Sequence, residues 1–157
     1  MHPVLLRYAW RYTGEREAAR DVVQDAFFKL WQIRETVDPS RSLKALLYTM
    51  VRNLALNSKR AAQHTNGVFP EHGLVDSTPS VDQKVQAEML NAHLRQCISE
   101  LPKRRREAFM LSRYEGLSHS EIAQVMGLTP RTVNTHIVLA LKDLRKRLGA
   151  LQADPSP

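Results

Sequence analysis

Apolar side chains recur at spacings of three and four residues along most of the chain, which is the period of a helix with one buried face. No stretch shows the strict alternation of apolar and polar positions that is typical of a half-buried strand. The pattern therefore predicts an all-α fold. The periodicity is lost between residues 63 and 80, where glycine, proline and small polar residues are typical of a linker.

This break predicts two small helical domains. The predicted segments are a first domain over 1–62, a flexible linker over 63–84, a second domain over 85–150 and a frayed tail over 151–157.

Three helices are predicted in the first domain, where apolar runs with helical spacing occupy residues 4–12, 19–31 and 43–54. Gly14 separates the first two runs, and an Asp-Pro-Ser triplet breaks the pattern before the third. Three helices in so short a span predict a small bundle.

In the second part of the chain, helices are predicted from near Val81 to Ser99 and within the stretch ELPKRRREAFMLSRYEG. The following stretch, GLSHSEIAQVMGLTPRTVNTHI, predicts two short helices joined by a sharp turn. Gly127 permits the left-handed turn, Thr129 can cap the next helix, and that last helix is predicted to end near Leu148. This is the pattern of a helix-turn-helix, whose second helix usually lies against DNA.

The last helix predicts a DNA-reading face when Val133, Ile137 and Leu144 are placed inward. Its outward and flanking positions near the N-terminus are Arg131, Thr132, Asn134, Thr135, His136, Val138 and Leu139. Arginine and asparagine side chains can bond base edges, and threonine or valine methyl groups can contact thymine. Further along, the basic residues are placed for phosphates; they are Lys142, Arg145 and Lys146. The alternative is a helical hairpin with no role in DNA binding.

The second predicted helix carries an acidic stripe opposite its apolar face of Val23, Ala26, Phe27 and Leu30. The stripe consists of Asp21, Asp25, Phe28 and Gln32, with Gln24 beside it. An exposed phenylalanine among fixed negative charges predicts a protein partner rather than DNA. The alternative is that the phenylalanine packs under another element of this chain.

The third predicted helix has a different outward stripe, in which aromatic and cationic side chains alternate. Its members are Tyr48, Arg52, Leu56 and Lys59, with Asn53 and Asn57 at the margin. Aromatic rings on which bases stack, with cations along the backbone, suit single-stranded nucleic acid. An ordinary amphipathic surface remains the alternative.

The charge favours a polyanionic partner, because 23 Lys and Arg residues oppose 16 Asp and Glu residues.

The one cysteine, Cys97, excludes an intrachain disulfide, and its apolar helical register predicts a buried thiol. No apolar run predicts a membrane span and no signal peptide is visible, so we expect a cytoplasmic protein. The six histidines lack metal-ligand spacing and no catalytic motif stands out, so no metal, cofactor, enzyme activity or small-molecule substrate is predicted.

Two segments of the first domain, EAARDVVQDAFFKLW and SLKALLYTMVRNLALNSKR, resemble region two of bacterial sigma factors of the extracytoplasmic-function group. The segment LPKRRREAFMLSRYEGLSHSEIAQVMGLTPRTVNTHIVLALKDL resembles region four of the same group. The two resemblances cover most of the chain, in the order that the group has them.

The resemblance implies a function in transcription initiation. The group's D-x-x-Q-D/E-x-F motif, which docks on core RNA polymerase, falls on Asp21, Gln24, Asp25 and Phe27. Its minus-ten motif, which captures an unstacked base together with the preceding loop, falls on Leu46, Leu47, Tyr48, Met50 and Asn53. Its recognition helix reads the minus-thirty-five element as duplex DNA, and an anti-sigma factor often holds members inactive.

Two departures from the group are visible. The chain starts inside the segment that resembles the first helix of region two, so we expect the natural start upstream or a shortened helix. Asn134, Thr135 and His136 stand where many members carry arginines, so the resemblance implies the docking mode but not the bases.

The resulting prediction is a sigma factor that binds core RNA polymerase and promoter DNA. Two alternatives are weaker. A response-regulator or quorum-sensing activator would need strands in its N-terminal half, and a nucleic-acid-modifying enzyme would need a metal or nucleophile motif.

Overall fold

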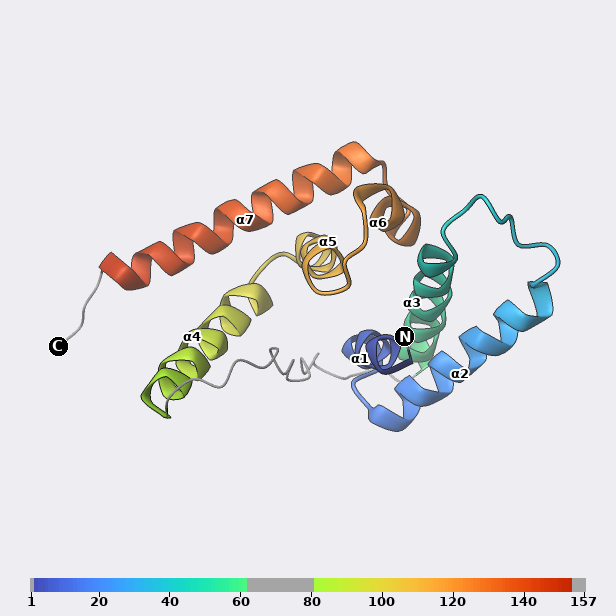
Figure 1. Ribbon diagram of the computed structural model, residues 1–157, viewed down its shortest axis with the longest axis horizontal. Coiled ribbons are helices and arrows are strands. Elements are labelled where there is room, and N and C mark those ends of the chain that lie inside the picture. Colours follow the sequence, from blue (N-terminus) through green and yellow to red (C-terminus); the bar gives the residue numbers. More distant parts are fainter. Residues whose placement is uncertain (1, 62–80, 154–157) are drawn as a thin grey trace. The chain divides into compact units, whose positions relative to one another are not determined.

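The computed structural model describes residues 2–61 and 81–153, and within them the chain forms helices and no strand (Figure 1). The all-α prediction is confirmed for these residues. The helices are α1 (His2–Thr13), α2 (Arg16–Ile33), α3 (Leu43–Ala61), α4 (Val81–Ser99), α5 (Lys103–Arg113), α6 (His119–Met126) and α7 (Pro130–Ala153).

Contacts between Cα atoms divide the chain into two compact units. The first unit contains Met1–His72 and Ser120–Leu128, and the second contains Gly73–His119 and Thr129–Pro157. The predicted linker lies largely outside the described residues, although its last four positions already belong to α4. The predicted domain boundaries therefore stay a prediction, and each unit is described by itself.

The first unit has a three-helix core in which α1, α2 and α3 each pack against the other two (Figure 1). Gly14, with φ of 72°, turns the chain between α1 and α2, and its amide donates to the carbonyl of Trp10 at 2.9 Å. The buried side chains are Leu5, Tyr8 and Ala9 from α1, Ala19, Val22, Val23 and Ala26 from α2, and Ala45, Leu47, Tyr48, Val51 and Ala55 from α3.

Aromatic rings occupy the centre of this core. The rings of Tyr8 and Tyr48 meet edge to face, with centroids 4.9 Å apart, and the ring of Tyr12 also meets that of Tyr8 edge to face, at 5.2 Å. Tyr8 and Tyr48 are each only 1% exposed. Edge-to-face contact between large buried rings is favourable beyond the area that it removes from water.

The prediction that Tyr48 faces outward on α3 is wrong. Ala45 and Ala55 lie on the same side of the helix as Tyr48, and their small side chains leave room for the tyrosine ring between α1 and α3. Met50 and Leu54, two apolar residues of the predicted run over 43–54, are only half-buried. The exposed face of α3 is the one that carries Asn53 and Asn57.

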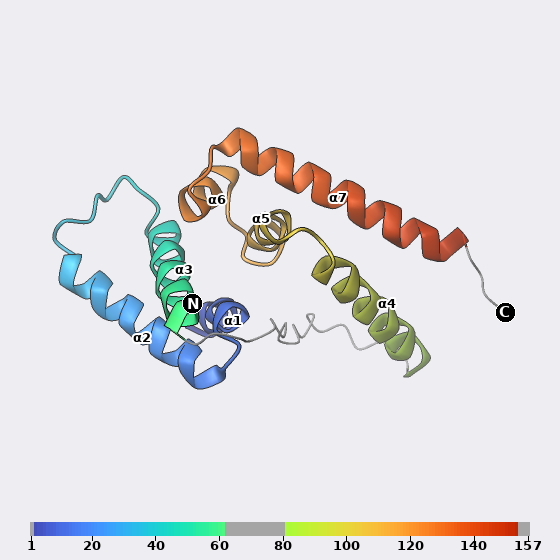
Figure 2. The same ribbon diagram turned by 180° about the vertical axis from the view of Figure 1, so that it is seen from behind.

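The second unit is built from α4, α5 and α7 (Figure 2). Its core cluster consists of Cys97, Ile98, Leu101, Phe109, Met110, Ala140 and Leu144, so the prediction of a buried thiol is confirmed. Two ion pairs join α7 to its neighbours. Arg105 of α5 donates to Asp143 at 2.6 Å, and Arg147 pairs with Glu100 at the end of α4.

The predicted turn before α7 is confirmed in its local geometry. Gly127 has φ of 68°, and the Leu128 amide donates to the carbonyl of Ala123 at 2.9 Å. Thr129 caps α7, because its hydroxyl accepts from the Thr132 amide at 3.2 Å. The helix ends at Ala153 rather than near Leu148, because Gly149 does not interrupt it and good helix formers follow.

The buried position of Tyr48 predicts a large loss of stability when its ring is removed. Tyr48→Ala should lower the free energy of unfolding of the first unit by about 3–5 kcal/mol, as large-to-small core substitutions do. Both tryptophans, Trp10 and Trp31, lie in this unit, so tryptophan fluorescence during denaturant unfolding should follow it.

Tyr48→Phe is the matched control, because it retains the ring that contacts Tyr8. It should cost only about 1 kcal/mol, the contribution of one hydrogen-bonding group. Equal stability of the alanine variant and the wild type would contradict the packing described here.

Candidate protein and nucleic-acid interfaces

The predicted acidic stripe lies on the solvent side of α2. Its five members, all exposed, are Asp21, Gln24, Asp25, Phe28 and Gln32. The opposite side of the helix is buried against α1 and α3 through its small and β-branched residues. Phe28 is 61% exposed, so it does not pack under another described element. The structure thus brings all the predicted polymerase-binding residues onto one open surface.

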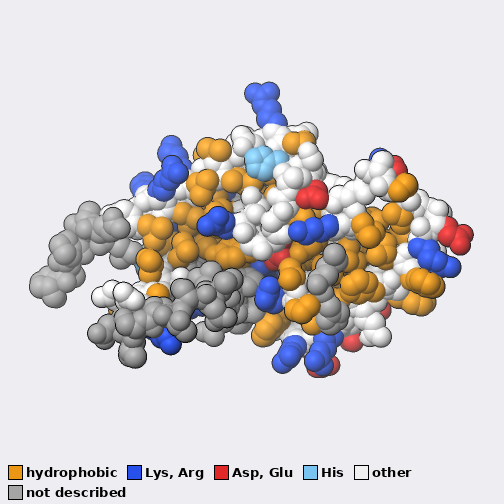
Figure 3. Space-filling model, viewed as in Figure 1, with side chains coloured by type: hydrophobic (Ala, Val, Ile, Leu, Met, Phe, Trp, Pro, Cys, Tyr) orange, Lys and Arg blue, Asp and Glu red, His pale blue; other side chains and the backbone are white. Residues whose placement is uncertain are grey.

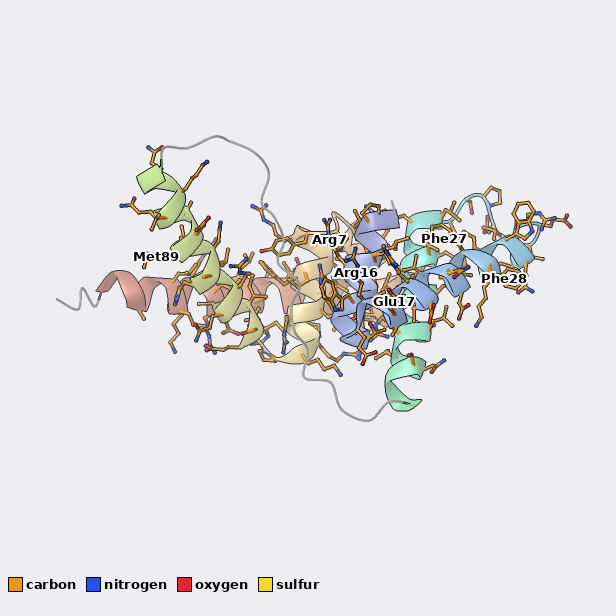
Figure 4. All side chains as sticks on the ribbon, turned by 90° about the horizontal axis from the view of Figure 1, so that it is seen from below. Arg7, Arg16, Glu17, Phe27, Phe28 and Met89 are labelled. Atoms are coloured by element: carbon orange, nitrogen blue, oxygen red, sulfur yellow. The ribbon has the colours of Figure 1, made fainter. Side chains whose placement is uncertain are left out.

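Phe27, the neighbouring motif residue, leaves α2 on a different side from Phe28 (Figure 4). It was expected to be buried, but it is 38% exposed. Ala26 and Val23 fill the core at this level of the helix, and α2 extends beyond α1 and α3 at its C-terminal end. Phe27 therefore forms part of a surface rather than of the core.

That surface is an apolar groove of about 600 Å³ at the C-terminal end of α2. The groove is lined by Phe27, Leu30, Trp31, Arg34, Val37, Asp38, Pro39, Arg41 and Leu43. Hydrophobic side chains are open to solvent in this part of the first unit, with Lys and Arg side chains among them (Figure 3). The groove was not predicted from the sequence.

The aromatic wall of the groove is held in place by a cation. Arg34 lies 4.0 Å from the centre of the Trp31 ring, and it also donates to the Trp31 carbonyl at 2.8 Å. Trp31 itself is 63% exposed. A guanidinium over an indole ring forms a cation–π contact, and much of the Trp31 side chain stays open to solvent beside it.

The loop between α2 and α3 forms the polar side of the groove. The carboxylate of Asp38 accepts from the hydroxyl of Ser40 at 2.6 Å and from the Ser40 amide at 2.9 Å. These hydrogen bonds, with a smaller effect of Arg41 at 3.8 Å, lower the pKa of Asp38 below its ordinary value. The loop therefore keeps a fixed turn with an ionised carboxylate at neutral pH. The Asp-x-Ser spacing was the sequence signal for this turn.

The predicted minus-ten residues of α3 do not form one surface. Asn53 and Asn57 are exposed on the same face, whereas Arg52 is half-buried and Tyr48 lies in the core. The side chain of Lys59 lies outside the described residues. Among the predicted residues of this helix whose side chains the structure describes, the two asparagines are thus the exposed ones.

The predicted recognition face of α7 is open along its length. Its exposed members are Arg131, Thr132, Asn134, Thr135, Lys142 and Arg145, while His136 is half-buried. The inward side buries Val133 and Leu144 as predicted, together with Ala140. Val138 is 54% exposed on the outward side.

The described part of the chain has no helix long and apolar enough to cross a membrane. Those same residues contain no cluster of three or more side chains of the types that ligate metals.

Comparisons with known proteins match both halves of the chain. The family model of sigma-70 region 2 matches residues 1–65, and that of sigma-70 region 4 matches residues 92–144. The ECF RNA polymerase sigma factor SigL of Mycobacterium tuberculosis is 31% identical over 149 residues, which cover 94% of this chain and 84% of SigL. The ECF sigma factor RpoE of Cereibacter sphaeroides is 29% identical over 83% of this chain and 72% of its own length.

Solved structures show the same likeness. CnrH, in complex with the cytosolic domain of CnrY, has a TM-score of 0.61 and 26% identity over 95% of this chain and 83% of CnrH. RpoE of Bartonella quintana, in complex with the anti-sigma factor NepR, has a TM-score of 0.61 and 25% identity over 94% and 91%. On these grounds the chain belongs to the extracytoplasmic-function (ECF) group of RNA polymerase sigma factors, which direct the polymerase to promoters.

Proposed function

We propose that this sigma factor docks on core RNA polymerase through the acidic stripe of α2, and that it contacts promoter DNA through the α2–α3 groove, α3 and α7. It acts in the cytoplasm and catalyses no reaction itself. The observation that carries this proposal is the composition of α2, which exposes Asp21, Asp25 and Phe28 together in an otherwise basic domain.

The chemistry of the α2 stripe suits a protein partner better than DNA. Carboxylates repel phosphates, so a helix that binds DNA would not present Asp21 and Asp25 side by side. Phe28 adds an exposed aromatic side chain, the type that contributes most to protein–protein binding when it is buried in a pocket. A basic and partly apolar surface on the polymerase would complement both features.

The groove beside α2 supports a revised site for the minus-ten element. The resemblance implies that the loop before α3 and the end of that helix capture an unstacked base. With Tyr48 in the core, the more exposed of the two aromatic residues that line the groove, Phe27 and Trp31, is Trp31, whose ring is in contact with Arg34. We assign base stacking to Trp31 and backbone or base hydrogen bonds to Asn53 and Asn57.

The face of α7 supports binding to duplex DNA of the minus-thirty-five element. Recognition helices present their first turns to the major groove, and here those turns carry Arg131, Asn134 and Thr135. Lys142 and Arg145 follow two to four turns later, where a straight helix passes the phosphate backbone.

Regulation by an anti-sigma factor fits the comparisons. CnrH was solved with the cytosolic domain of CnrY, and RpoE of Bartonella quintana was solved with the anti-sigma factor NepR. We propose that a protein of this kind also binds the present chain.

Asp25→Arg is expected to weaken binding to core polymerase at least tenfold, because it places a cation where the partner is expected to be basic. Run-off transcription by core polymerase supplemented with the variant should fall in parallel. Asp25 is exposed, so circular dichroism should show an intact fold.

Glu88→Arg on α4 is the matched control. It makes the same change of charge at another exposed helical position outside the stripe, and it should leave polymerase binding unchanged. Wild-type affinity of the Asp25 variant would remove the stripe from the interface.

Trp31→Ala and Asn53→Ala are expected to impair promoter opening more than initial promoter binding. Loss of one base stack costs about 1–3 kcal/mol, so opening by the tryptophan variant should fall by about tenfold. Permanganate reactivity of unpaired thymines measures opening, and filter binding on ice measures the closed complex. Trp31→Phe, which keeps a ring, should retain most of the activity; full opening by the alanine variant would exclude stacking on this residue.

Asn134→Ala and Lys142→Ala are expected to differ in kind. Loss of the asparagine should relax the base preference at one position by about 1–3 kcal/mol. Loss of the lysine should weaken binding to all sequences alike and reduce the log–log salt slope by about one unit. Binding of both variants to a panel of upstream elements at several salt concentrations measures the two effects. If the lysine variant changed the base preference and the asparagine variant changed only the overall affinity, α7 would dock in another orientation.

A further inference from the structure

The outward face of α7 has an apolar centre between two cationic ends. Arg131, Thr135, Val138 and Lys142 follow one another at helical spacing, so they form a single stripe. All four are exposed. The cations at both ends would hold DNA along this stripe, and the two central side chains would then lie against the base edges.

The hydroxyl proton of Thr135 is engaged within α7. The hydroxyl donates to the carbonyl oxygen of Arg131 at 3.1 Å, one turn earlier in the helix. Most groups on the major-groove edges of guanine and thymine are hydrogen-bond acceptors, and a hydroxyl whose proton is committed cannot donate to them. Toward guanine and thymine, Thr135 is therefore left with its γ-methyl group as the contact it can make.

Val138 presents two more methyl groups one turn further on. It is 54% exposed, while Val133, Ala140 and Leu144 supply the buried side of the same helix. Core packing therefore does not explain an apolar side chain at this position. Three residues advance a helix by about 4.5 Å, which is close to the 3.4 Å step between base pairs. Thr135 and Val138 can thus address neighbouring base pairs.

We propose that Thr135 and Val138 read the 5-methyl groups of thymines in the upstream promoter element, and that Val138 is a specificity residue of this helix. The thymine methyl is the apolar group that the major groove offers to such side chains. The inference rests on the proposed role of α7 in duplex binding, and it specifies the base that this face selects.

Replacement of thymine by deoxyuracil tests the proposal, because it removes only the methyl group. Holoenzyme made from core polymerase and the full chain would first select duplexes from a pool with a randomised upstream element. Each thymine of a selected duplex would then be replaced singly by deoxyuracil. Wild-type holoenzyme should lose about fourfold in affinity at one or two neighbouring positions, the factor for one methyl group removed from water.

Matched variants of Thr135 separate the methyl group from the hydroxyl. Thr135→Ser keeps the hydroxyl and its bond to Arg131, and it should abolish the deoxyuracil effect at one position. Thr135→Val keeps a methyl group without the hydroxyl, and it should retain the effect. Val138→Ala should abolish the effect at the neighbouring position.

Three results would overturn the proposal while leaving promoter binding by α7 intact. One is a selected element without thymine on either strand, another is equal binding of all deoxyuracil duplexes, and the third is loss of discrimination in the valine but not the serine variant. If holoenzyme selects no upstream element at all, the proposed role of α7 fails together with this inference.

Discussion

The contact between Tyr8 and Tyr48 decides which sides of the first unit face solvent. Once the Tyr48 ring is buried between α1 and α3, the rotation of α3 about its own axis is set, and Asn53 is turned outward. A rotation that exposed Tyr48 would remove one of the largest buried rings from the core. The polar surface of α3 is thus a consequence of aromatic packing on its opposite side.

The three proposed interfaces differ in chemistry because their partners differ. The α2 stripe is acidic and would repel nucleic acid, so it suits a protein. The groove at the end of α2 combines an aromatic wall with cations, which suits a single-stranded base. The α7 face places cations around an apolar centre, which suits the phosphates and methyl groups of duplex DNA. The acidic stripe repels both forms of DNA, and the cations of the other two surfaces repel a basic protein surface. Repulsion therefore adds to the specificity that attraction gives.

The features that the sequence predicted well are local. Helix ends at Gly14 and Gly127, and the cap at Thr129, follow from backbone sterics and short hydrogen bonds that involve a few neighbouring residues. The outward stripe of α2 could also be predicted from the sequence, because the buried face of that helix contains only apolar residues. The orientation of α3 could not be predicted in this way, because the helix carries its own leucine and methionine side chains on several sides. The correct rotation depends on packing partners from other helices, among them the ring of Tyr8, about forty positions away in the chain. The groove was missed for the same reason, because its walls come from both α2 and a loop.

The charges of α7 show how one helix can be anchored to its own domain and still present cations to DNA. Asp143 and Arg147 are engaged with Arg105 and Glu100, so their charges serve the packing of α7 within the second unit. Lys142 and Arg145 are not members of these two ion pairs, and both are exposed. The two pairs leave the positive charge of the outward face unchanged, because Asp143 and Arg147 lie on a different face of the helix from Lys142 and Arg145. The base-reading centre of α7 can therefore be apolar. The affinity of α7 for DNA comes from the exposed cations, and its position comes from the ion pairs of Asp143 and Arg147 and from the buried Ala140 and Leu144.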